Sequence, residues 1–498
     1  MLDYQSRAQK ESHIMQLTPQ PMILCESHSM VKRSSKTLDC LALVVFVLIA
    51  ALLSLVAPQL FAQSAVEDEA LLLSNARIIV GDGSLIEKGS LLLENGIISA
   101  VGIEAELSLP SQVREIDLSG KTIIPGLIDA HAHLGYEGYT SWGAENYSSS
   151  NLIDHLQRYA YYGFSAVFSA GSDPDELAFA VQAQQNEGEF LAAKFLFAAG
   201  VAPPGQGPND QFLRHALRLE EQTGMAILYG VDSEEQAKNA VREIADKGIS
   251  IIKIWVDDRG GTQKKLAPSL YKNIILAAKE NHIQVFVHQQ FANDMPELLS
   301  AGVDGFLHGR LGQDLDQELA QQIAQADAFV IPNLGLGELR SETIGNDVFL
   351  QSSISVATAN RLSLDSAQRT ANPARNNNRE NELSESFSKL IENGVDIILG
   401  TDAGAIPDHF FGYTGHRELE IFVRLGMSPM QALIAATSKP AARLGLDKMG
   451  LLKQGYSADM VILNSNPLDD IRNTRSIFSV FLNGELIDRD ALAQSFRN

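Results

Sequence analysis

The sequence predicts an α/β protein built around a (β/α)8 barrel of the TIM type, with a small β-sandwich domain formed by both ends of the chain. Eight apolar, strand-like runs lie between residues 122 and 402, and most are followed by a helix-like stretch. Strands that are apolar throughout are typical of a parallel sheet covered on both faces, and eight such units predict a barrel. Short β-rich segments flank this region, at 70–120 and near the C-terminus.

The expected strands follow one another in a regular order. The first lies within 122–133, where the sequence reads TIIPGLIDAHAH. The other seven are expected at 164–171, 194–202, 249–256, 283–288, 303–308, 328–334 and 395–402. We therefore divide the chain into an N-terminal extension with signal peptide (1–62), a first part of the β-sandwich (66–122), the barrel (123–446) and a second part of the β-sandwich (447–498).

Residues 338–386 interrupt this alternation after the seventh strand and include the polar run NPARNNNREN. An insertion after a barrel strand lies at the C-terminal face, where barrel enzymes carry their active sites. Two interpretations are open: a solvated surface excursion, and a lid over the active site.

The composition excludes several classes of protein. The 498 residues are 45% hydrophobic and 20% charged, which excludes a collagen-like, coiled-coil or wholly disordered chain. With 39 basic and 61 acidic residues, the formal net charge is −22, so no nucleic-acid partner is expected. The expected partner is a small-molecule substrate, and a homo-oligomer remains open.

The N-terminal region has the features of a secretory leader. The apolar run 41–57 follows Lys32, Arg33 and Lys36, and small residues follow it. This order is typical of a signal peptide, with cleavage expected after Ala62. The protein would then be periplasmic or otherwise exported, without stable membrane association. Because the run of seventeen residues is just long enough to span a bilayer, an inner-membrane anchor formed by 41–57 is the alternative.

The two cysteines, Cys25 and Cys40, both precede this apolar run, so the cleaved protein would contain none. Disulfides, cysteine nucleophiles and thiolate metal sites would then be excluded together.

Six residues of ligand type end or interrupt five of the expected strands. His131 and His133 close the first strand, and because alternate side chains of a strand share a face, both imidazoles point the same way. The others come from the fourth, fifth, sixth and eighth strands: Lys253, His288, His308 and Asp402. A lone histidine is more often structural, and an aspartate after Gly-Thr often caps a helix. The ordered set, in contrast, predicts a metal site where the strand ends converge.

This set resembles the ligands of the amidohydrolase superfamily. The phrases PGLIDAHAH, IIKIWVDDRGG, GFLHG, LGTDAG and GYSADMVILNSNPLDDI are most similar to its imidazolonepropionase-like branch, which includes prolidase-like Xaa-Pro dipeptidases. The resemblance extends from about residue 70 to 490. It implies the barrel and β-sandwich, and a metal-dependent hydrolase that acts on carbon–nitrogen bonds.

The resemblance also implies a role for each ligand. His131, His133 and Asp402 would hold a buried metal ion, and His288 and His308 would hold a second. Imidazole and oxygen ligands suit Zn²⁺, with other divalent metals open. Asp402 would be the catalytic residue, taking the proton from the attacking water and passing it to the leaving nitrogen.

Lys253 stands where the resemblance implies a carboxylated lysine. An ammonium group repels metal ions, whereas a carbamate formed with CO₂ offers two anionic oxygens and would bridge both ions. Because Asp257 and Asp258 follow closely, a structural ion pair with Lys253 is the alternative.

Four further residues are expected near the substrate. Arg310 follows His308 by two and would pair with a substrate carboxylate, or else lie solvated at the rim. His409 and His416 are expected in the loop after the eighth strand, facing the mouth, and Tyr136 would wall a small pocket.

The leading hypothesis is an exported, metal-dependent amidohydrolase in which a metal-activated water cleaves the amide bond of a dipeptide or an N-acyl amino acid. The alternative is a one-metal deaminase or cyclic-amide hydrolase on the same barrel, which metal content would distinguish. A membrane-anchored binding protein is a third class, but binding alone would not require all six ligand-type residues.

The leader gives the first testable prediction. Protein purified from an exporting Gram-negative host should begin near Gln63, Ala65 or Val66 when its N-terminus is sequenced. An intact N-terminus in the membrane fraction would contradict cleavage and favour the anchor.

Overall fold

A computed structural model describes residues 70–103, 107–289, 291–308, 315–336, 344–367 and 373–497, without the side chains of 365–367 and 373–377. Contacts divide the chain into two units, Met1–Glu67 and Asp68–Asn498, and every described residue belongs to the second. The leader, the alternative anchor 41–57 and Arg310 lie outside the described residues. Within the described ranges, no helix is long and apolar enough to cross a membrane.

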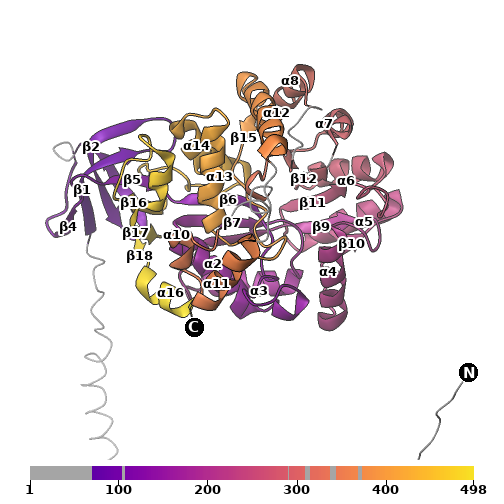
Figure 1. The fold of residues 1–498 in the computed structure, drawn as a ribbon, viewed down its shortest axis with the longest axis horizontal. Helices are drawn as coiled ribbons and strands as arrows, with labels where there is room; N and C mark the ends of the chain where they lie inside the picture. Colours follow the sequence, from indigo (N-terminus) through magenta and orange to yellow (C-terminus); the bar gives the residue numbers. More distant parts are fainter. Residues whose placement is uncertain are drawn as a thin grey trace, which may run out of the picture. The chain divides into compact units, whose positions relative to one another are not determined.

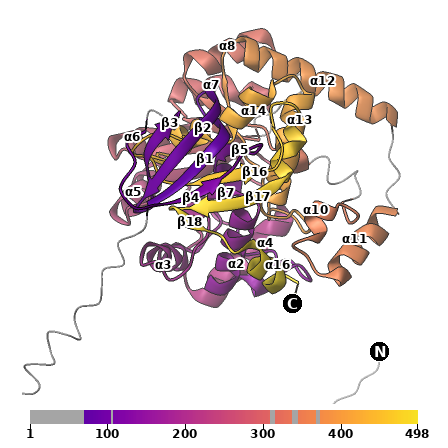
Figure 2. The same ribbon diagram turned by 90° about the vertical axis from the view of Figure 1, so that its left-hand side faces the viewer.

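Strands from the N-terminal and C-terminal parts of the described residues form one mixed sheet, which Figure 1 and Figure 2 show in indigo and yellow. Its order is β18-β17-β16-β5-β1-β2-β3, with β4 beside β1. The strands are β1 Ala70–Ile79, β2 Leu85–Glu94, β3 Ile97–Gly102, β4 Val113–Asp117, β5 Thr122–Pro125, β16 Met460–Leu463, β17 Ile477–Leu482 and β18 Glu485–Leu486. The two sides meet where β16 pairs antiparallel with β5, with Val461 opposite Ile124.

The predicted parallel strands are present in two runs, β6-β7-β8 and β10-β9-β11-β12-β13-β14-β15. They are β6 Leu127–Ala132, β7 Phe164–Ser169, β8 Lys194–Phe197, β9 Ala199–Ala202, β10 Leu228–Gly230, β11 Ile251–Val256, β12 Gln284–Gln289, β13 Gly305–Leu307, β14 Phe329–Ile331 and β15 Asp396–Ile397. Every residue of β6, β7 and β11 is buried, as expected for parallel strands that helices cover.

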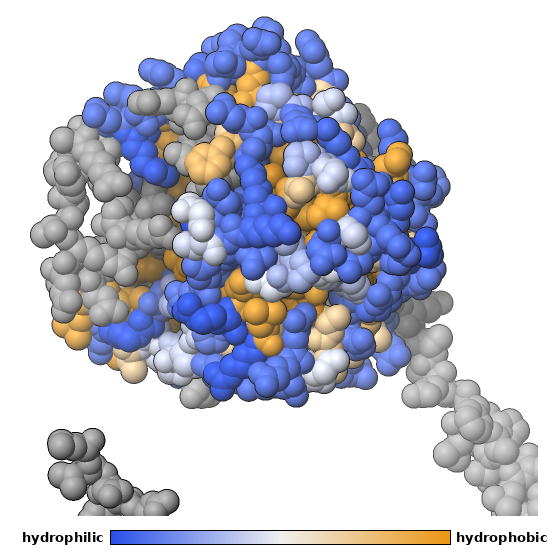
Figure 3. Space-filling view, turned by 90° about the vertical axis from the view of Figure 1, so that its right-hand side faces the viewer, coloured by the Kyte–Doolittle hydropathy of each residue, from blue (hydrophilic) through white to orange (hydrophobic). Residues whose placement is uncertain are grey.

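Helices follow most of the parallel strands. They are α2 Ser149–Tyr161, α3 Asp175–Asn186, α4 Asp210–Thr223, α5 Glu234–Asp246, α6 Pro268–Glu280, α7 Met295–Ala301, α8 Gln317–Gln325, α13 Tyr413–Arg424, α14 Pro429–Ala435, α15 Ser438–Arg443 and α16 Arg489–Ser495, with 3₁₀ turns at Ala144–Asn146, Ala292–Asp294 and Ile471–Arg475. Side chains of Ser148, Asn209 and Ser233 cap α2, α4 and α5, satisfying N–H groups that a helix leaves unpaired. The face that carries α5 and α6 is largely hydrophilic (Figure 3).

Two of the expected strands are each divided in the structure. Residues 122–133 form β5, in the mixed sheet, and β6, in the parallel run, so the chain passes between sheets at Gly126, a few residues later than the expected boundary at 123. A Cβ at Gly126 would lie 2.5 Å from the Cβ of Ser165, so the close approach requires glycine. Similarly, 194–202 forms β8, which pairs with β7, and β9, which pairs with β11.

Backbone hydrogen bonds connect the first and last parallel strands. Ala130 N donates to Leu399 O at 3.0 Å, and Asp402 N donates to His131 O at 2.7 Å. A parallel bridge between Ala132 and Ala403 continues this contact. The C-terminal ends of β6 and of the segment after β15 therefore lie side by side.

The insertion 338–386 is helical over much of its described length. It contains α10 Val348–Gln351, α11 Val356–Ala367 and the first part of α12 Pro373–Glu392. The polar run NPARNNNREN lies almost wholly in α12, which begins at a proline, a residue favoured at the first helical position. In α11, the two terminal nitrogens of Arg361 donate to the two carboxylate oxygens of Asp408, at 2.7 and 2.5 Å. The insertion is thus tied to the segment that follows Asp402, while its role as a lid remains a prediction.

A buried carboxylate links the connected strands. Asp129 Oδ1 accepts hydrogen bonds from the backbone N–H groups of His131 (3.1 Å) and Thr401 (3.0 Å). Its Oδ2 accepts from the hydroxyls of Tyr159 (2.7 Å) and Thr401 (2.6 Å). The carboxylate thus joins β6, α2 and the segment before Asp402.

Replacement of this carboxylate should destabilise the fold. We expect Asp129→Ala to lower the free energy of unfolding by about 3 kcal/mol or more, because several buried donors lose their acceptor. Urea denaturation measures the change. Asp232→Ala is the control, since Asp232 is exposed, and should change stability by less than about 0.5 kcal/mol. Equal effects of the two variants would show that Asp129 does not hold these strands.

Candidate metal centre

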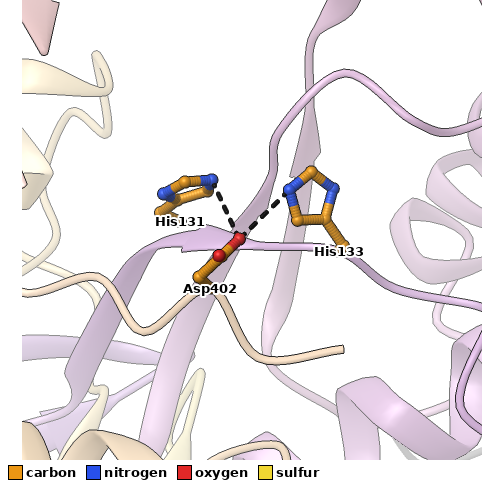
Figure 4. A group of neighbouring side chains, drawn as sticks. All are labelled: His131, His133 and Asp402. Atoms are coloured by element: carbon orange, nitrogen blue, oxygen red, sulfur yellow. Dashed lines mark ion pairs between the residues drawn. The ribbon is translucent and has the colours of Figure 1, made fainter. Parts of the chain in front are cut away.

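Two imidazoles and one carboxylate meet where β6 and the segment after β15 lie side by side (Figure 4). The Nε2 atoms of His131 and His133 lie 3.4 and 3.2 Å from the same Oδ1 of Asp402. All three side chains are buried. Asp402 has a φ of 61°, which is a left-handed backbone conformation. In this conformation its backbone N–H donates a hydrogen bond to His131 O. The strand positions predicted from the sequence thus bring the three groups together.

The other ring nitrogen of each histidine has its own partner. His131 Nδ1 lies 3.1 Å from Asn333 Oδ1, and His133 Nδ1 lies 2.7 Å from Ser172 Oγ. Because an amide oxygen only accepts, His131 carries its proton on Nδ1 and directs the lone pair of Nε2 toward Asp402. Such partners fix the tautomer and ring orientation of a metal-binding histidine.

The cluster fits a divalent metal ion. His131 Nε2 and Asp402 Oδ1 are buried, and neither has a hydrogen-bond partner in the described part of the chain. One ligand atom from each of His131, His133 and Asp402 lies within 4.8 Å of the others. Two imidazole nitrogens and a carboxylate oxygen at this spacing are ligands that Zn²⁺ and similar ions accept.

The electrostatics favour the protonation states that metal binding requires. Burial lowers the pKa of His131 and of His133, which favours the neutral imidazole, while Asp402 opposes this shift. Burial alone would raise the pKa of Asp402, but its attraction to the rings of His308, His131 and His133 in their protonated forms holds this pKa well below its usual range.

Two more predicted ligands adjoin this cluster. The ring of His308, which follows β13, lies 4.6 Å from the ring of His131 and 4.8 Å from that of His288, measured between centroids. His308 Nδ1 is 3.9 Å from Asp402 Oδ2. With His131 and His133 at 5.4 Å, the four imidazoles form a continuous row from β6 to β12.

Lys253 is buried in β11, with 1% of its surface exposed. Asp257 and Asp258 are both described, and neither forms an ion pair with it; Asp257 instead pairs with His288 and Arg259, each at 3.0 Å. Burial lowers the pKa of Lys253 to about 7, so a neutral amine, the form that reacts with CO₂, is present near neutral pH. The structural ion pair between Lys253 and these two acids is thus not present among the described residues.

Tyr136 lies after β6, as expected, but is fully buried. Its hydroxyl donates to Ser172 O at 2.9 Å, and its ring packs edge-on against Phe212 at 4.7 Å. Phe212 in turn lies 4.9 Å from the ring of His133. Trp142 stacks on Tyr136 and packs edge-on against Phe212. An aromatic group thus covers one side of His133.

The expectation that His416 lies in a loop and faces the mouth is wrong. It lies in α13, where its Nδ1 is 3.0 Å from Thr474 Oγ1 and its Nε2 is 2.8 Å from Tyr162 O. Tyr162 precedes β7, at the opposite strand end from the ligands. His409 does lie in the segment after Asp402 and is buried.

Three partners of the ligand histidines are not predicted as such from the sequence: Asn333, Ser172 and Asp257, of which only Asp257 is considered there, as a partner of Lys253. Each follows the C-terminal end of a parallel strand, β14, β7 and β11 respectively. Their place shortly after a parallel strand is the sequence signal that could have identified these three residues, because side chains there face the same end of the sheet as the ligands.

A model of the amidohydrolase family matches residues 122–487, most of the described chain. The chain belongs to this family. Its predicted resemblance is confirmed, and the chain is a hydrolase that acts on carbon–nitrogen bonds.

Individual relatives agree with this assignment. Ochratoxinase from Aspergillus niger is 25% identical over 447 residues, which cover 82% of this chain and 85% of the relative. Imidazolonepropionase from Geobacillus kaustophilus is 45% identical over 64 residues, 12% of this chain and 15% of that protein. The structure of a Xaa-Pro dipeptidase with bound methionine is 23% identical with a TM-score of 0.64, covering 84% of this chain and all of that one, 100%. These neighbours support an amidohydrolase fold of the TIM-barrel type.

A pair of variants separates the ligand cluster from the structural histidine. We expect His131→Ala to fold but to bind Zn²⁺ at least about 100-fold more weakly, since it loses a direct ligand. His416→Ala should keep its Zn²⁺ affinity and lose about 2–4 kcal/mol of stability, because two buried hydrogen bonds and packing are removed. Competition titration with a chelator and urea denaturation measure these two effects. The reverse pattern would contradict the assignment.

Proposed function

We propose that this protein is an exported amidohydrolase that uses two Zn²⁺ ions to hydrolyse the amide bond of a dipeptide or an N-acyl amino acid. The observation that carries the proposal is the cluster of His131, His133 and Asp402, whose ligand atoms lie within 4.8 Å of one another; His131 Nε2 and Asp402 Oδ1 have no hydrogen-bond partner among the described residues. We further propose that the parallel strands form one closed (β/α)8 barrel over 123–446, and that 66–122 and 447–498 form the β-sandwich.

The number of ligand-type side chains supports two ions. His131, His133 and Asp402 would hold the first ion, and His288 and His308 the second. Five such groups exceed the four positions of one tetrahedral ion. Carboxylated Lys253 would bridge the ions, and its burial without a partner carboxylate from the adjacent turn supports this role. When bound, the ions would polarise the substrate carbonyl and lower the pKa of a shared water.

Asp402 is the residue proposed to move the proton. Its carboxylate is ionised, and its two oxygens lie near imidazoles from different strands. As the water oxygen bonds to the carbonyl carbon, Asp402 accepts a proton from that water. The carbon–nitrogen bond then breaks as Asp402 returns the proton to the leaving nitrogen, giving an acid and an amine.

The substrate class rests on the sequence and on the relatives. Arg310, two residues after His308, is proposed to pair with a substrate carboxylate, as expected for a dipeptide or an N-acyl amino acid. Tyr136 and His409 are proposed to line the pocket, through the aromatic group beside His133 and the segment after Asp402. The dipeptide substrate of a Xaa-Pro dipeptidase supports this class for a chain of similar fold.

A one-metal deaminase or cyclic-amide hydrolase is the second candidate. The observation that favours it is that His131, His133 and Asp402 alone among the described residues form a group within 4.8 Å, whereas His288 and His308 lie outside that group. Export to the periplasm is proposed from the order of charges and apolar residues before Ala62, and homo-oligomerisation stays open.

The proposed reaction makes Asp402 indispensable. We expect the parent protein to hydrolyse members of a panel of dipeptides and N-acyl amino acids, and Asp402→Asn to lose at least about 100-fold in kcat, because the amide cannot accept the proton. Steady-state amine release measures the rate. Asp408→Asn makes the same chemical change at a partly exposed position of the same segment, where the carboxylate pairs with Arg361 and not with a ligand histidine, and kcat should stay within about threefold of the parent.

Two results would contradict this proposal. One is an Asp402→Asn variant that hydrolyses substrate near the parent rate. The other is a metal-loaded parent protein that cleaves no member of the panel but deaminates a heterocyclic amine or opens a cyclic amide.

A further inference from the structure

His288 differs from the other ligand histidines in the nitrogen that its neighbour occupies. Its Nε2 lies 3.0 Å from Asp257 Oδ2, and both side chains are buried. An ionised carboxylate only accepts hydrogen bonds, so Nε2 carries the proton and Nδ1 retains the lone pair. In His131 and His133 the arrangement is the reverse, with Nδ1 occupied and Nε2 facing Asp402.

Asp257 is itself held on both of its oxygens. Oδ1 accepts the backbone N–H of Arg259 at 2.9 Å, and Oδ2 lies 3.0 Å from Arg259 Nη1. Arg259 has a φ of 52°, which turns its backbone N–H toward the carboxylate, and its Nη2 donates to Gly207 O at 3.2 Å. The carboxylate therefore cannot rotate away from His288 without breaking bonds to Arg259.

The neighbouring acid lacks this role. Asp258 accepts a hydrogen bond from the backbone N–H of Gly260 at 3.0 Å, within its own turn, and it is half-buried. The two acids are adjacent in the sequence and carry the same charge, so Asp258 is a matched control for Asp257.

We propose that Asp257, held by Arg259, is a positioning residue that fixes the ring and tautomer of His288 and so makes Nδ1 the atom that binds the second metal ion. This inference rests on the proposed function only in assigning His288 to that ion. When the ring nitrogen that does not bind the metal donates to a carboxylate, the carboxylate fixes the orientation of the ring and makes the metal-binding nitrogen more basic. Loss of such a partner lowers metal affinity by about 10- to 100-fold.

The alternative is that Asp257 only stabilises the turn after β11. A structural role would lower the stability of the protein without a preference for one ion. A positioning role instead weakens the second ion and leaves the first unchanged, because His131, His133 and Asp402 do not depend on Asp257. The selective loss of one ion therefore distinguishes the two roles.

The test is a titration of metal-free protein with Zn²⁺ in competition with a chelator, with elemental analysis at saturation. The parent protein should bind two ions. Asp257→Asn should bind the first ion as the parent does and the second about 10- to 100-fold more weakly, because an amide cannot accept at both oxygen positions. Asp258→Asn should match the parent for both ions.

Arg259→Met provides an independent variant. Unlike Asp257→Asn, it does not place an amide at the buried position of Asp257. It keeps Asp257 but removes one of its donors, so it should weaken the second ion by a smaller factor, about threefold or more. Unchanged affinity for the second ion in both Asp257→Asn and Arg259→Met would overturn the inference while leaving the proposed function intact. A parent protein that binds one ion would overturn the inference together with the two-ion form of the proposed function.

Discussion

The hydrogen bond from Asp402 N to His131 O, 2.7 Å long, is the contact on which the site depends. It joins residues that are distant in the sequence and brings the end of β6 against the segment after β15. Asp129 strengthens the same connection from the buried side, through bonds to the backbone of both segments. Because this contact is made by backbone atoms and a buried carboxylate, it holds Asp402 Oδ1 within 3.4 Å of both imidazoles.

Around this contact, each of three strand ends supplies a partner for one ligand histidine. Asn333 after β14, Ser172 after β7 and Asp257 after β11 occupy the ring nitrogens that face away from the proposed ions. The imidazoles are therefore held by neighbours on other strands. Such an arrangement directs the free ring nitrogens of these histidines toward the proposed metal ions. It thereby lowers the conformational entropy that the side chains would lose when a metal ion binds.

Much of this centre could be predicted from the sequence because the signals are local. A His-x-His at a strand end places both rings on one face, and apolar runs that each end in a ligand-type residue predict convergence. In the same way, the apolar runs 249–256 and 395–402 predict that Lys253 lies within a strand and that Asp402 lies at a strand end. The partners of the rings could not be predicted, since Asn333 is 202 residues from His131 and nothing in either local pattern joins them.

The errors have equally specific causes. The sequence predicts a loop at His416 because this residue follows soon after the eighth strand, whereas α13 already begins at Tyr413. The burial of His416 against Tyr162 is a tertiary contact that the local sequence does not show. The division of 122–133 at Gly126 was missed because both halves are apolar, and apolar character does not show to which sheet a strand belongs.

Diffraction from zinc-soaked crystals, recorded on both sides of the zinc absorption edge, tests whether His131, His133 and Asp402 bind a metal ion. We expect an anomalous peak within coordination distance of His131 Nε2, His133 Nε2 and Asp402, at about 2.0–2.2 Å from each ligand atom. A second peak is expected beside His288 Nδ1 and His308. Anomalous density absent from the cluster of His131, His133 and Asp402 in zinc-saturated protein would contradict the assignment of a metal centre to these residues.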